Sequence, residues 1–382
     1  MIATNLAGFE NLPQTLPHYC FESFRRNNKS DALRYKVNGI WHQIAGTAAI
    51  DRVRQIALGL NALGIKAGDR VAIISENRPE WSMTDLALLC LRAVNVPIYT
   101  TQAVDQIRYI LENSGTKMLL ISGKKLYKHS AEAIHSVESL EKIVFFDDAE
   151  ADESRAMTLD AVIQLGNESD RDQSVFDDLL KEIKPDDLAT IIYTSGTTGV
   201  PKGVMLTHQN FVSNVVSISK GLPITTSDRS LAVLPLSHIF ERTVFYVLCA
   251  NGVSVSYCAS FDQLAGHLQE VKPTIMTAVP RLFEQVYHKI VKKGMSAGGW
   301  KTRLFEWSLG VGQEYWERKD KHEPVPATLA GKHSIANRLV FSKWRDGVGG
   351  KLRFFVSGGA PLSKKLSYAF WRRVFRSCKD MA

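Results

Sequence analysis

The chain has 382 residues, of which 45% are hydrophobic and 23% are charged, and its formal net charge is +8. This composition excludes a wholly disordered chain and a Gly/Pro low-complexity protein, and the length favours two or more subdomains. Five widely separated cysteines without a CxxC pair argue against a disulfide scaffold and against a cysteine-based zinc site. We therefore expect reduced thiols, most of them in the core.

The excess positive charge gathers at the C-terminal end. Residues 363–382 hold six Lys and Arg against one acid, which leaves a net charge of +3 for the first 362 residues. A charge excess confined to a tail is weak support for nucleic acid binding, so we expect no nucleic acid partner. We find neither a secretory signal pattern nor a run of about 20 apolar residues. We expect a cytoplasmic protein, and peripheral contact with the inner face of a membrane stays open.

Strand and helix patterns alternate from residue 71 onward. The strand–helix–strand order indicates βαβ units and mostly parallel sheets. The predicted strands are 71–75, 96–99, 117–122, 142–146, 189–193, 203–206, 230–234, 253–257, 274–278 and 352–357. The predicted helices are 79–93, 103–113, 131–140, 209–220, 240–250, 261–271, 280–292 and 334–345.

We divide the chain into three parts. Residues 1–187 form an N-terminal α/β subdomain that ends in an acidic surface excursion with one short helix from 147 onward. Residues 188–362 form a second α/β subdomain with a helical insertion at about 294–332, and residues 363–382 are an atypical basic tail. The insertion contains Trp300, Trp307 and Trp316, which either pack the insertion or meet a membrane interface.

The most informative segment is Tyr193-Thr-Ser-Gly-Thr-Thr-Gly-Val-Pro-Lys-Gly-Val204, which follows a β-branched strand. Its glycines let backbone N–H groups approach a phosphate, its hydroxyls add donors, and Lys202 supplies a positive charge. It is not a Walker A loop, because Pro201 stands where that pattern needs glycine. We predict a loop for a triphosphate or a pyrophosphate. The alternative is a flexible Ser/Thr/Gly surface turn.

This segment resembles the signature loop of the AMP-binding, or acyl-adenylate-forming, superfamily, and the resemblance covers about residues 39–362. Residues 68–81, 235–242 and 277–287 resemble the long-chain acyl-CoA synthetase branch, and Ser357-Gly-Gly-Ala-Pro-Leu362 is similar to the adenine-pocket segment. The resemblance implies an α/β fold like the N-terminal domain of acyl-adenylate synthetases. Such a domain has two parallel-rich sheet subdomains with helices on both faces, and we expect the C-terminal lid domain to be absent from this chain.

The resemblance also implies the site. His238, Lys202 and Thr194 are the catalytic residues it suggests, with His238 beside the carboxylate and the α-phosphate. The nucleotide-binding residues that it implies are Thr194, Ser195, Gly196, Thr197, Thr198, Gly199, Lys202, Ser357, Gly358, Gly359, Ala360 and Pro361. The last five follow a predicted strand end, where ligands of α/β sheets bind.

Simpler readings of these residues stay open. His238 could make only a local hydrogen bond at a helix N-terminus, and Gly358-Gly359 could be a tight turn. Glu241 and Arg242 could be a simple surface pair, and they are left out of the catalytic residues. No metal ligand is assigned.

The implied activity is that of a long-chain fatty acid–CoA ligase, which uses ATP and Mg²⁺ to convert a fatty acid through acyl-AMP to acyl-CoA. The alternatives are a fatty acyl-AMP ligase, another adenylate-forming enzyme, or an inactive nucleotide- or lipid-binding fragment.

The family's Tyr-Gly-x-Thr-Glu motif does not follow Leu362. We therefore expect a truncated or frameshifted chain with incomplete activity. A basic amphipathic helix through Leu366, Phe370 and Val374 is the other interpretation of the tail. The preferred acyl chain length and the oligomeric state cannot be predicted from these patterns.

Overall fold

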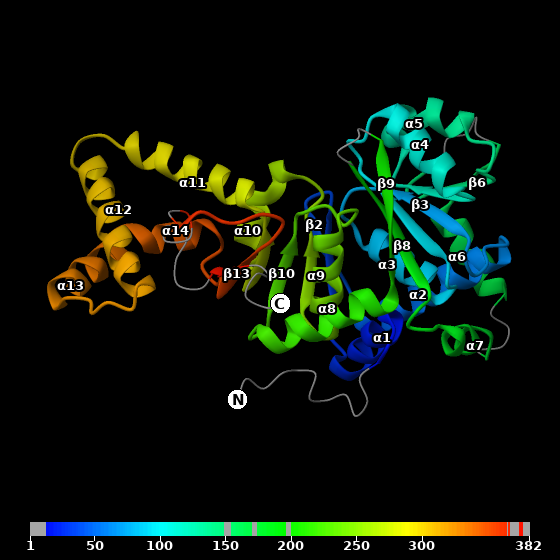
Figure 1. Ribbon diagram of the computed structural model, residues 1–382, viewed down its shortest axis with the longest axis horizontal. Helices are drawn as coiled ribbons and strands as arrows, with labels where there is room; N and C mark the ends of the chain where they lie inside the picture. Colours follow the sequence, from blue (N-terminus) through cyan, green and yellow to red (C-terminus); the bar gives the residue numbers. More distant parts are fainter. Residues whose placement is uncertain are drawn as a thin grey trace. The chain divides into compact units, whose positions relative to one another are not determined.

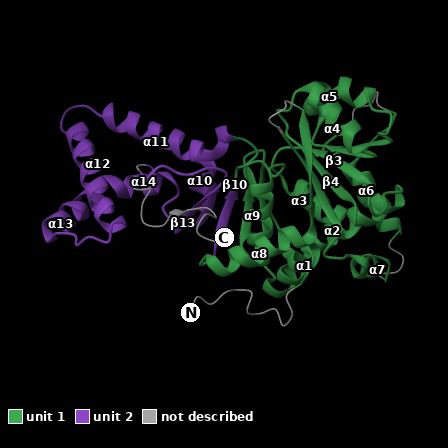
Figure 2. Ribbon diagram, in the orientation of Figure 1, with its two compact units in different colours: residues 1–227, 232–260 green, residues 228–231, 261–382 purple. Residues whose placement is uncertain are grey.

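The computed structural model divides the chain into two compact units, coloured separately in Figure 2. Unit 1 comprises residues 1–227 and 232–260, and unit 2 comprises residues 228–231 and 261–382. The residues that the structure describes are 13–148, 154–169, 174–195, 200–364, 366 and 374–376. These limits differ from the division predicted at residue 187, because β8 (Leu188–Ser195) pairs with β4 (Val94–Ile98) in the first subdomain.

The main sheet of unit 1 has the strand order β7-β6-β5-β3-β4-β8-β9. Figure 1 labels β6, β3, β8 and β9 of this sheet. Neighbouring strands are parallel from β7 to β8, as predicted, and β8 and β9 are antiparallel. Its central strands are buried apolar runs, which is typical of a parallel sheet covered on both faces. The remaining strands are β3 (Arg70–Ile74), β5 (Met118–Ile121), β6 (Lys142–Phe145), β7 (Ala156–Thr158) and β9 (Pro201–Thr207).

Helices connect these strands close to the predicted positions. α3 (Pro79–Cys90) begins with proline at its first position, and α4 (Val104–Ser114) ends at Gly115, whose φ is positive. α5 (Lys124–Ser136) begins seven residues before the predicted helix, because Tyr127 already belongs to its buried face. Apolar residues of α4 and α5 pack with the strands in one core.

The acidic excursion contains more structure than the single short helix we predicted. It holds β7, α6 (Leu159–Ser169) and α7 (Ser174–Glu182). α6 packs closely against α2 (Gly46–Ala62): a Cβ atom on Gly166 would lie 1.9 Å from the carbonyl oxygen of Gln55. Two glycines, Gly166 and Gly59, therefore allow this close helix crossing.

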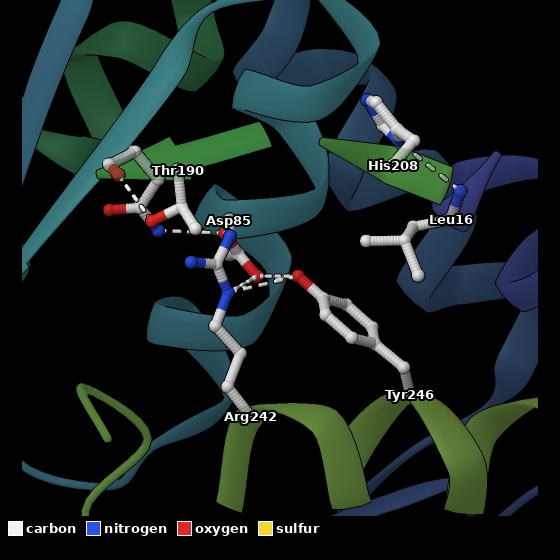
Figure 3. A network of polar contacts seen from close by, with 7 residues as sticks. Leu16, Asp85, Thr190, His208, Arg242 and Tyr246 are labelled. Carbon is white, nitrogen blue, oxygen red and sulfur yellow. Dashed lines mark hydrogen bonds and ion pairs between the residues drawn. The ribbon is translucent and has the colours of Figure 1, made fainter. Parts of the chain in front are cut away.

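Residues 13–62, where no helix or strand was predicted, complete unit 1. β1 (Leu33–Val37) pairs antiparallel with β2 (Ile40–Ile44) and parallel with β11 (Ser254–Tyr257). α1 (Leu16–Asn27) is fixed at both ends: the Leu16 N–H donates to Nδ1 of His208 at 3.2 Å (Figure 3), and Ser23 Oγ donates to the Cys249 carbonyl. Burial lowers the pKa of His208 to about 4, which keeps the imidazole a neutral acceptor. The other helices of this unit are α8 (His208–Gly221) and α9 (Ile239–Ala250).

Unit 2 combines parallel strands with a group of helices. Its strand order is β14-β13-β12-β10, from β10 (Arg229–Ala232), β12 (Ile275–Ala278), β13 (Phe354–Ser357) and β14 (Val374–Arg376). The backbone of Val374 thus lies in a strand, and not in the amphipathic helix considered for the tail. No helix within the described ranges has the length and apolar content needed to cross a membrane.

The helical insertion is longer than predicted and has a core of its own. That core contains Phe305, Val311, Leu329, Val340 and Phe341. Its helices are α11 (Pro280–Met295), α12 (Gly299–Asp320), α13 (Ala327–Ala336), η3 (Asn337–Phe341) and α14 (Ser342–Gly347). η2 (Phe261–Gln263) and α10 (Leu264–Val271) precede them.

Candidate functional site

The predicted phosphate loop connects the two strands of an antiparallel hairpin. β8 and β9 both extend beyond their predicted limits, and their register places Thr194 opposite Lys202. Gly196, Thr197, Thr198 and Gly199 lie outside the described residues. The backbone register alone therefore brings a predicted hydroxyl donor and a predicted cation to the two ends of the loop. Thr194 and Lys202 are both exposed.

The base of this hairpin is held by an aromatic anchor. The Tyr193 hydroxyl donates to Asn113 Oδ1 at 2.6 Å, and the Tyr193 ring meets the edge of Tyr109. Burial raises the pKa of Tyr193, so the phenol stays a neutral donor. Gly203 is opposite Tyr193, and a Cβ atom there would lie 2.7 Å from the Ile191 side chain. This glycine is needed for packing at the hairpin base, which fixes the approach to the loop.

His238 lies directly before α9 and caps its N-terminus. Its Nδ1 atom accepts a hydrogen bond from the Phe240 backbone N–H at 3.1 Å, so the neutral ring carries its proton on Nε2. Burial lowers the pKa of His238, which favours this neutral form at pH 7. The local hydrogen bond is the one expected of a helix N-terminal histidine, and the Tyr99 ring lies beside the imidazole at 6.4 Å. The place of His238 beside a substrate carboxylate stays a prediction.

One turn further along α9, Arg242 is fully buried, and the interpretation of Glu241 and Arg242 as a surface pair is wrong. Arg242 Nη2 donates to Asp85 Oδ1 at 2.6 Å, and its Nε donates to Oδ2 at 3.1 Å (Figure 3). The Tyr246 hydroxyl and the Asn95 amide also donate to Asp85. The Asp85 carboxylate thus accepts four hydrogen bonds from two elements, α9 and β4, which offsets the cost of burying the two charges.

The Asp85 network continues to the strand that leads into the loop. The side chain of Asn95, on β4, donates to Asp85 at 2.7 Å, and its backbone carbonyl accepts from Thr190 Oγ1 at 2.6 Å. Thr190 belongs to β8, four residues before Thr194. Buried polar contacts therefore connect the helix that begins after His238 with the strand that ends at the predicted phosphate loop.

Asn77 fixes the segment before His238. Its amide donates to the carbonyl oxygens of Ala232 and Leu234, and its Oδ1 accepts from the Leu236 N–H. Trp81, from the same loop-and-helix segment, lies under the Arg242 guanidinium with 5.8 Å between Arg242 Cζ and the ring. Two of the segments with long-chain resemblance, 68–81 and 235–242, are thus packed together. Neither Asn77 nor Asp85 was among the predicted site residues, and the polar Asn77 shortly after a buried strand was the available signal.

The predicted adenine segment, described by itself, begins in β13 of unit 2. Ser357 is buried, and its Oγ has no hydrogen-bond partner in the part of the chain that the structure describes. The Gly358 N–H donates to the Ala278 carbonyl at 3.2 Å, and Gly359 adopts a φ of +80° at the surface. The unpartnered Ser357 hydroxyl beside two glycines is compatible with a polar planar ligand such as a base. The positive φ of Gly359 is equally compatible with a tight turn.

An ion pair between a buried carboxylate and an exposed arginine holds the start of β13. Asp228 accepts from Arg353 Nη1 through both carboxylate oxygens and from Thr274 Oγ1 at 2.6 Å. These residues come from the starts of neighbouring strands, so they fix the register that carries Ser357. Ala360 and Pro361 follow as exposed residues. Within the described ranges, no group of three or more His, Cys, Asp or Glu could hold a metal ion.

Comparison with known sequences identifies related proteins. The family model described as AMP-binding enzyme matches residues 21–381. The chain is 34% identical over 336 residues to the long-chain-fatty-acid–CoA ligase FadD15 of Mycobacterium bovis, covering 87% of this chain and 54% of that protein. It is 29% identical over 388 residues to fatty acyl-CoA synthetase A of Dictyostelium discoideum, covering 97% and 55%. The chain therefore spans about half the length of these curated relatives.

Solved structures show the same fold at lower sequence identity. The N-terminal domain of FACL13 from Mycobacterium tuberculosis superposes with a TM-score of 0.65 at 20% identity, covering 93% of this chain and 72% of that one. A long-chain-fatty-acid–CoA ligase, FadD1, from Archaeoglobus fulgidus gives a TM-score of 0.68 at 18% identity, covering 94% and 60%. The predicted α/β fold class is confirmed by these similarities.

Proposed function

Because the chain belongs to the AMP-binding enzyme family, we propose that it forms the adenylating part of a long-chain fatty acid–CoA ligase. Relatives that are 29–34% identical carry names for that activity, and the similarity to them covers most of this chain. The substrates are then a long-chain fatty acid, ATP and coenzyme A, with contact to a membrane surface as the source of the lipid.

The proposed reaction has two steps. A fatty acid carboxylate oxygen attacks the α-phosphorus of ATP, the bond to the bridging oxygen breaks, and pyrophosphate leaves with that electron pair. The sulfur of coenzyme A then attacks the acyl carbon, and AMP leaves. The first step brings two anions together, so it depends on positioning and on neutralising the charge of the leaving group.

The single observation that carries this proposal is the pairing of Thr194 with Lys202 across the β8–β9 hairpin. It places a cation and a hydroxyl at the ends of a Ser/Thr/Gly loop, where they would hold the β- and γ-phosphates. Ser195, Gly196, Thr197, Thr198 and Gly199 would add backbone and hydroxyl donors to those phosphates.

The other residues have supporting roles in this proposal. The unpartnered Ser357 hydroxyl and residues 358–361 would contact the adenine. His238, held neutral with its proton on Nε2, would donate to the substrate carboxylate or the α-phosphate. Mg²⁺ would accompany the nucleotide phosphates, and we assign no residue of this chain to it.

Palmitate-dependent ATP–pyrophosphate exchange tests the proposal. We expect exchange above the control without acid, and we expect Lys202→Ala to lower it by about 10²–10³, the usual cost of losing one charge-stabilising group. Lys220→Ala removes an exposed lysine at the end of α8 and is the matched control.

The other outcomes separate the alternatives. Exchange without CoA-dependent thioester formation indicates a fatty acyl-AMP ligase. Binding of ATP by folded protein without any exchange contradicts the proposal and indicates an inactive nucleotide-binding protein. Equal exchange in Lys202→Ala and Lys220→Ala contradicts the role given to Lys202.

A further inference from the structure

A second concentration of positive charge lies inside the helical insertion. Residues 289–345 hold twelve Lys and Arg against five Asp and Glu, a net charge of +7. The rest of the chain before the basic tail is net negative. These basic residues are spread over several helices and form no continuous run, so their charge excess is less apparent in the sequence than that of the tail.

Exposed apolar side chains gather in the same helices. Five of the twelve large hydrophobic side chains that are exposed in the described residues lie between 295 and 339. Trp300 is 70% exposed and Trp307 is 37% exposed. Neither belongs to the core of the insertion, whereas Trp344 packs against Phe305 and Phe341. Trp316 packs against Tyr315, in agreement with a packing role. Trp300 and Trp307 are exposed and remain available for an interface.

Exposed apolar and basic side chains lie close together in the sequence on either side of the turn between α11 and α12. Trp300, Arg303 and Trp307 recur at three- and four-residue spacing along α12, so they lie on one helix face. Met295 ends α11 just before them, and Lys292 and Lys293 occupy the last turn of that helix. All six side chains are exposed. We call Lys292, Lys293, Met295, Trp300, Arg303 and Trp307 the α11–α12 surface.

Acidic residues are few on this surface. Glu306 flanks Arg303, and Glu314 is the first acid on the Trp300 face, about two turns beyond Trp307. Tryptophan is enriched where an apolar layer meets water, and Lys and Arg are attracted to anionic headgroups. A purely polyanionic partner would explain the basic residues and leave the exposed tryptophans without a role.

We propose that the α11–α12 surface docks on an anionic lipid bilayer, with Trp300 and Trp307 entering the headgroup region and the basic residues contacting lipid phosphates. This inference rests on the proposed function in one respect: an enzyme that uses long-chain fatty acids has a reason to contact a membrane. It adds the surface through which the contact is made. Binding is peripheral, since it requires no membrane-crossing helix.

Sedimentation of the 382-residue chain with phosphatidylcholine vesicles, with and without phosphatidylglycerol, tests the proposal. We expect binding to the anionic vesicles that weakens as salt is added. Lys292→Gln/Lys293→Gln should weaken it about 30-fold, from two lost headgroup attractions. Trp300→Ala/Trp307→Ala should weaken it about tenfold or more, from lost apolar burial.

Two matched controls test whether binding depends on this surface or on any exposed lysine or aromatic side chain. Lys124→Gln/Lys125→Gln removes the same charge from two exposed adjacent lysines of α5, and Phe261→Ala removes an aromatic side chain that is 52% exposed. Both should bind like the unaltered chain, and all variants should keep its thermal midpoint because the changed side chains are exposed.

Absence of sedimentation, or equal losses in the test and control variants, overturns the proposal. If only the lysine variant loses vesicle binding, and DNA competes with the vesicles for the unaltered chain, the surface is a general polyanion site and the proposal is overturned. Because binding is measured without ATP or fatty acid, a failure of the ligase proposal in the exchange assay does not affect this result.

Discussion

The side chain with the largest expected effect on stability is Asp85, which accepts four hydrogen bonds in a fully buried site. Asp85→Asn should destabilise the chain by about 3–5 kcal/mol, because the Arg242 charge stays buried without its counter-charge. Urea unfolding of the two proteins measures this difference.

Asp147→Asn is the control for Asp85→Asn. Asp147 pairs with Arg78 at 2.9 Å, but its side chain is 58% exposed, so the change should cost at most about 1 kcal/mol. If both variants unfold at the same urea concentration, the buried pair contributes no more than a surface one.

For individual residues, the sequence pointed to features contained in one short segment. It did not reveal side chains whose partners lie far away in the sequence. Thr194 and Lys202 could be named as candidates because nine residues contain both the hydroxyls and the cation. Arg242 was misread because its partner Asp85 is 157 positions away, and charge patterns along one helix do not show such a pair. Asn77 was missed for the same reason, since its partners lie beyond residue 231.

Among the elements, the crossing of α2 and α6 depends on the absence of side chains. Gly166→Ala should force the helices apart and destabilise the chain by about 2–3 kcal/mol, because its Cβ would lie 1.9 Å from a backbone oxygen. A drop in the thermal midpoint would measure this cost.

Gly310→Ala provides the matched control for Gly166→Ala. Gly310 also lies inside a helix, α12, but nothing stands within 4 Å of a Cβ there. Alanine should stabilise that helix by up to about 1 kcal/mol. Opposite shifts for the two glycines are expected, and equal shifts would contradict the close crossing.

Most strands and helices after residue 70 were predicted within a few residues, because buried β-branched runs and helical periodicity are local signals. α6 was missed because an acidic, polar composition was taken as a sign of surface loop, although Leu159, Val162 and Ile163 form its buried side. The limits of the two units differ from the predicted division at residue 187, because strand pairing between β4 and β8 is not a local property.

In the molecule as a whole, the thiols of the described residues are protected. Cys20, Cys90, Cys249 and Cys258 are buried and free, in agreement with the expected reduced core thiols. Burial raises the pKa of Cys90 and Cys249 well above the usual range and that of Cys258 to about 11. Few reactive thiolates therefore form near neutral pH.

Titration with a thiol reagent at pH 8 should detect at most one rapidly reacting cysteine in the folded chain, namely Cys378, which lies outside the described residues. All five should react once the chain is unfolded in urea. Rapid reaction of two or more thiols without denaturant would show that the core opens readily.

The hydrogen bond from Ser23 to the Cys249 carbonyl joins residues 226 positions apart, and it has a consequence for biosynthesis. At a translation rate of about 5–20 residues per second, α1 leaves the ribosome roughly 10–45 seconds before the helix that it packs against. During that interval, the apolar side of α1, with Leu16, Tyr19, Phe21 and Phe24, has no final partner on α9. The nascent α1 is therefore a segment for chaperones to shield, and its contact with α9 forms late in folding.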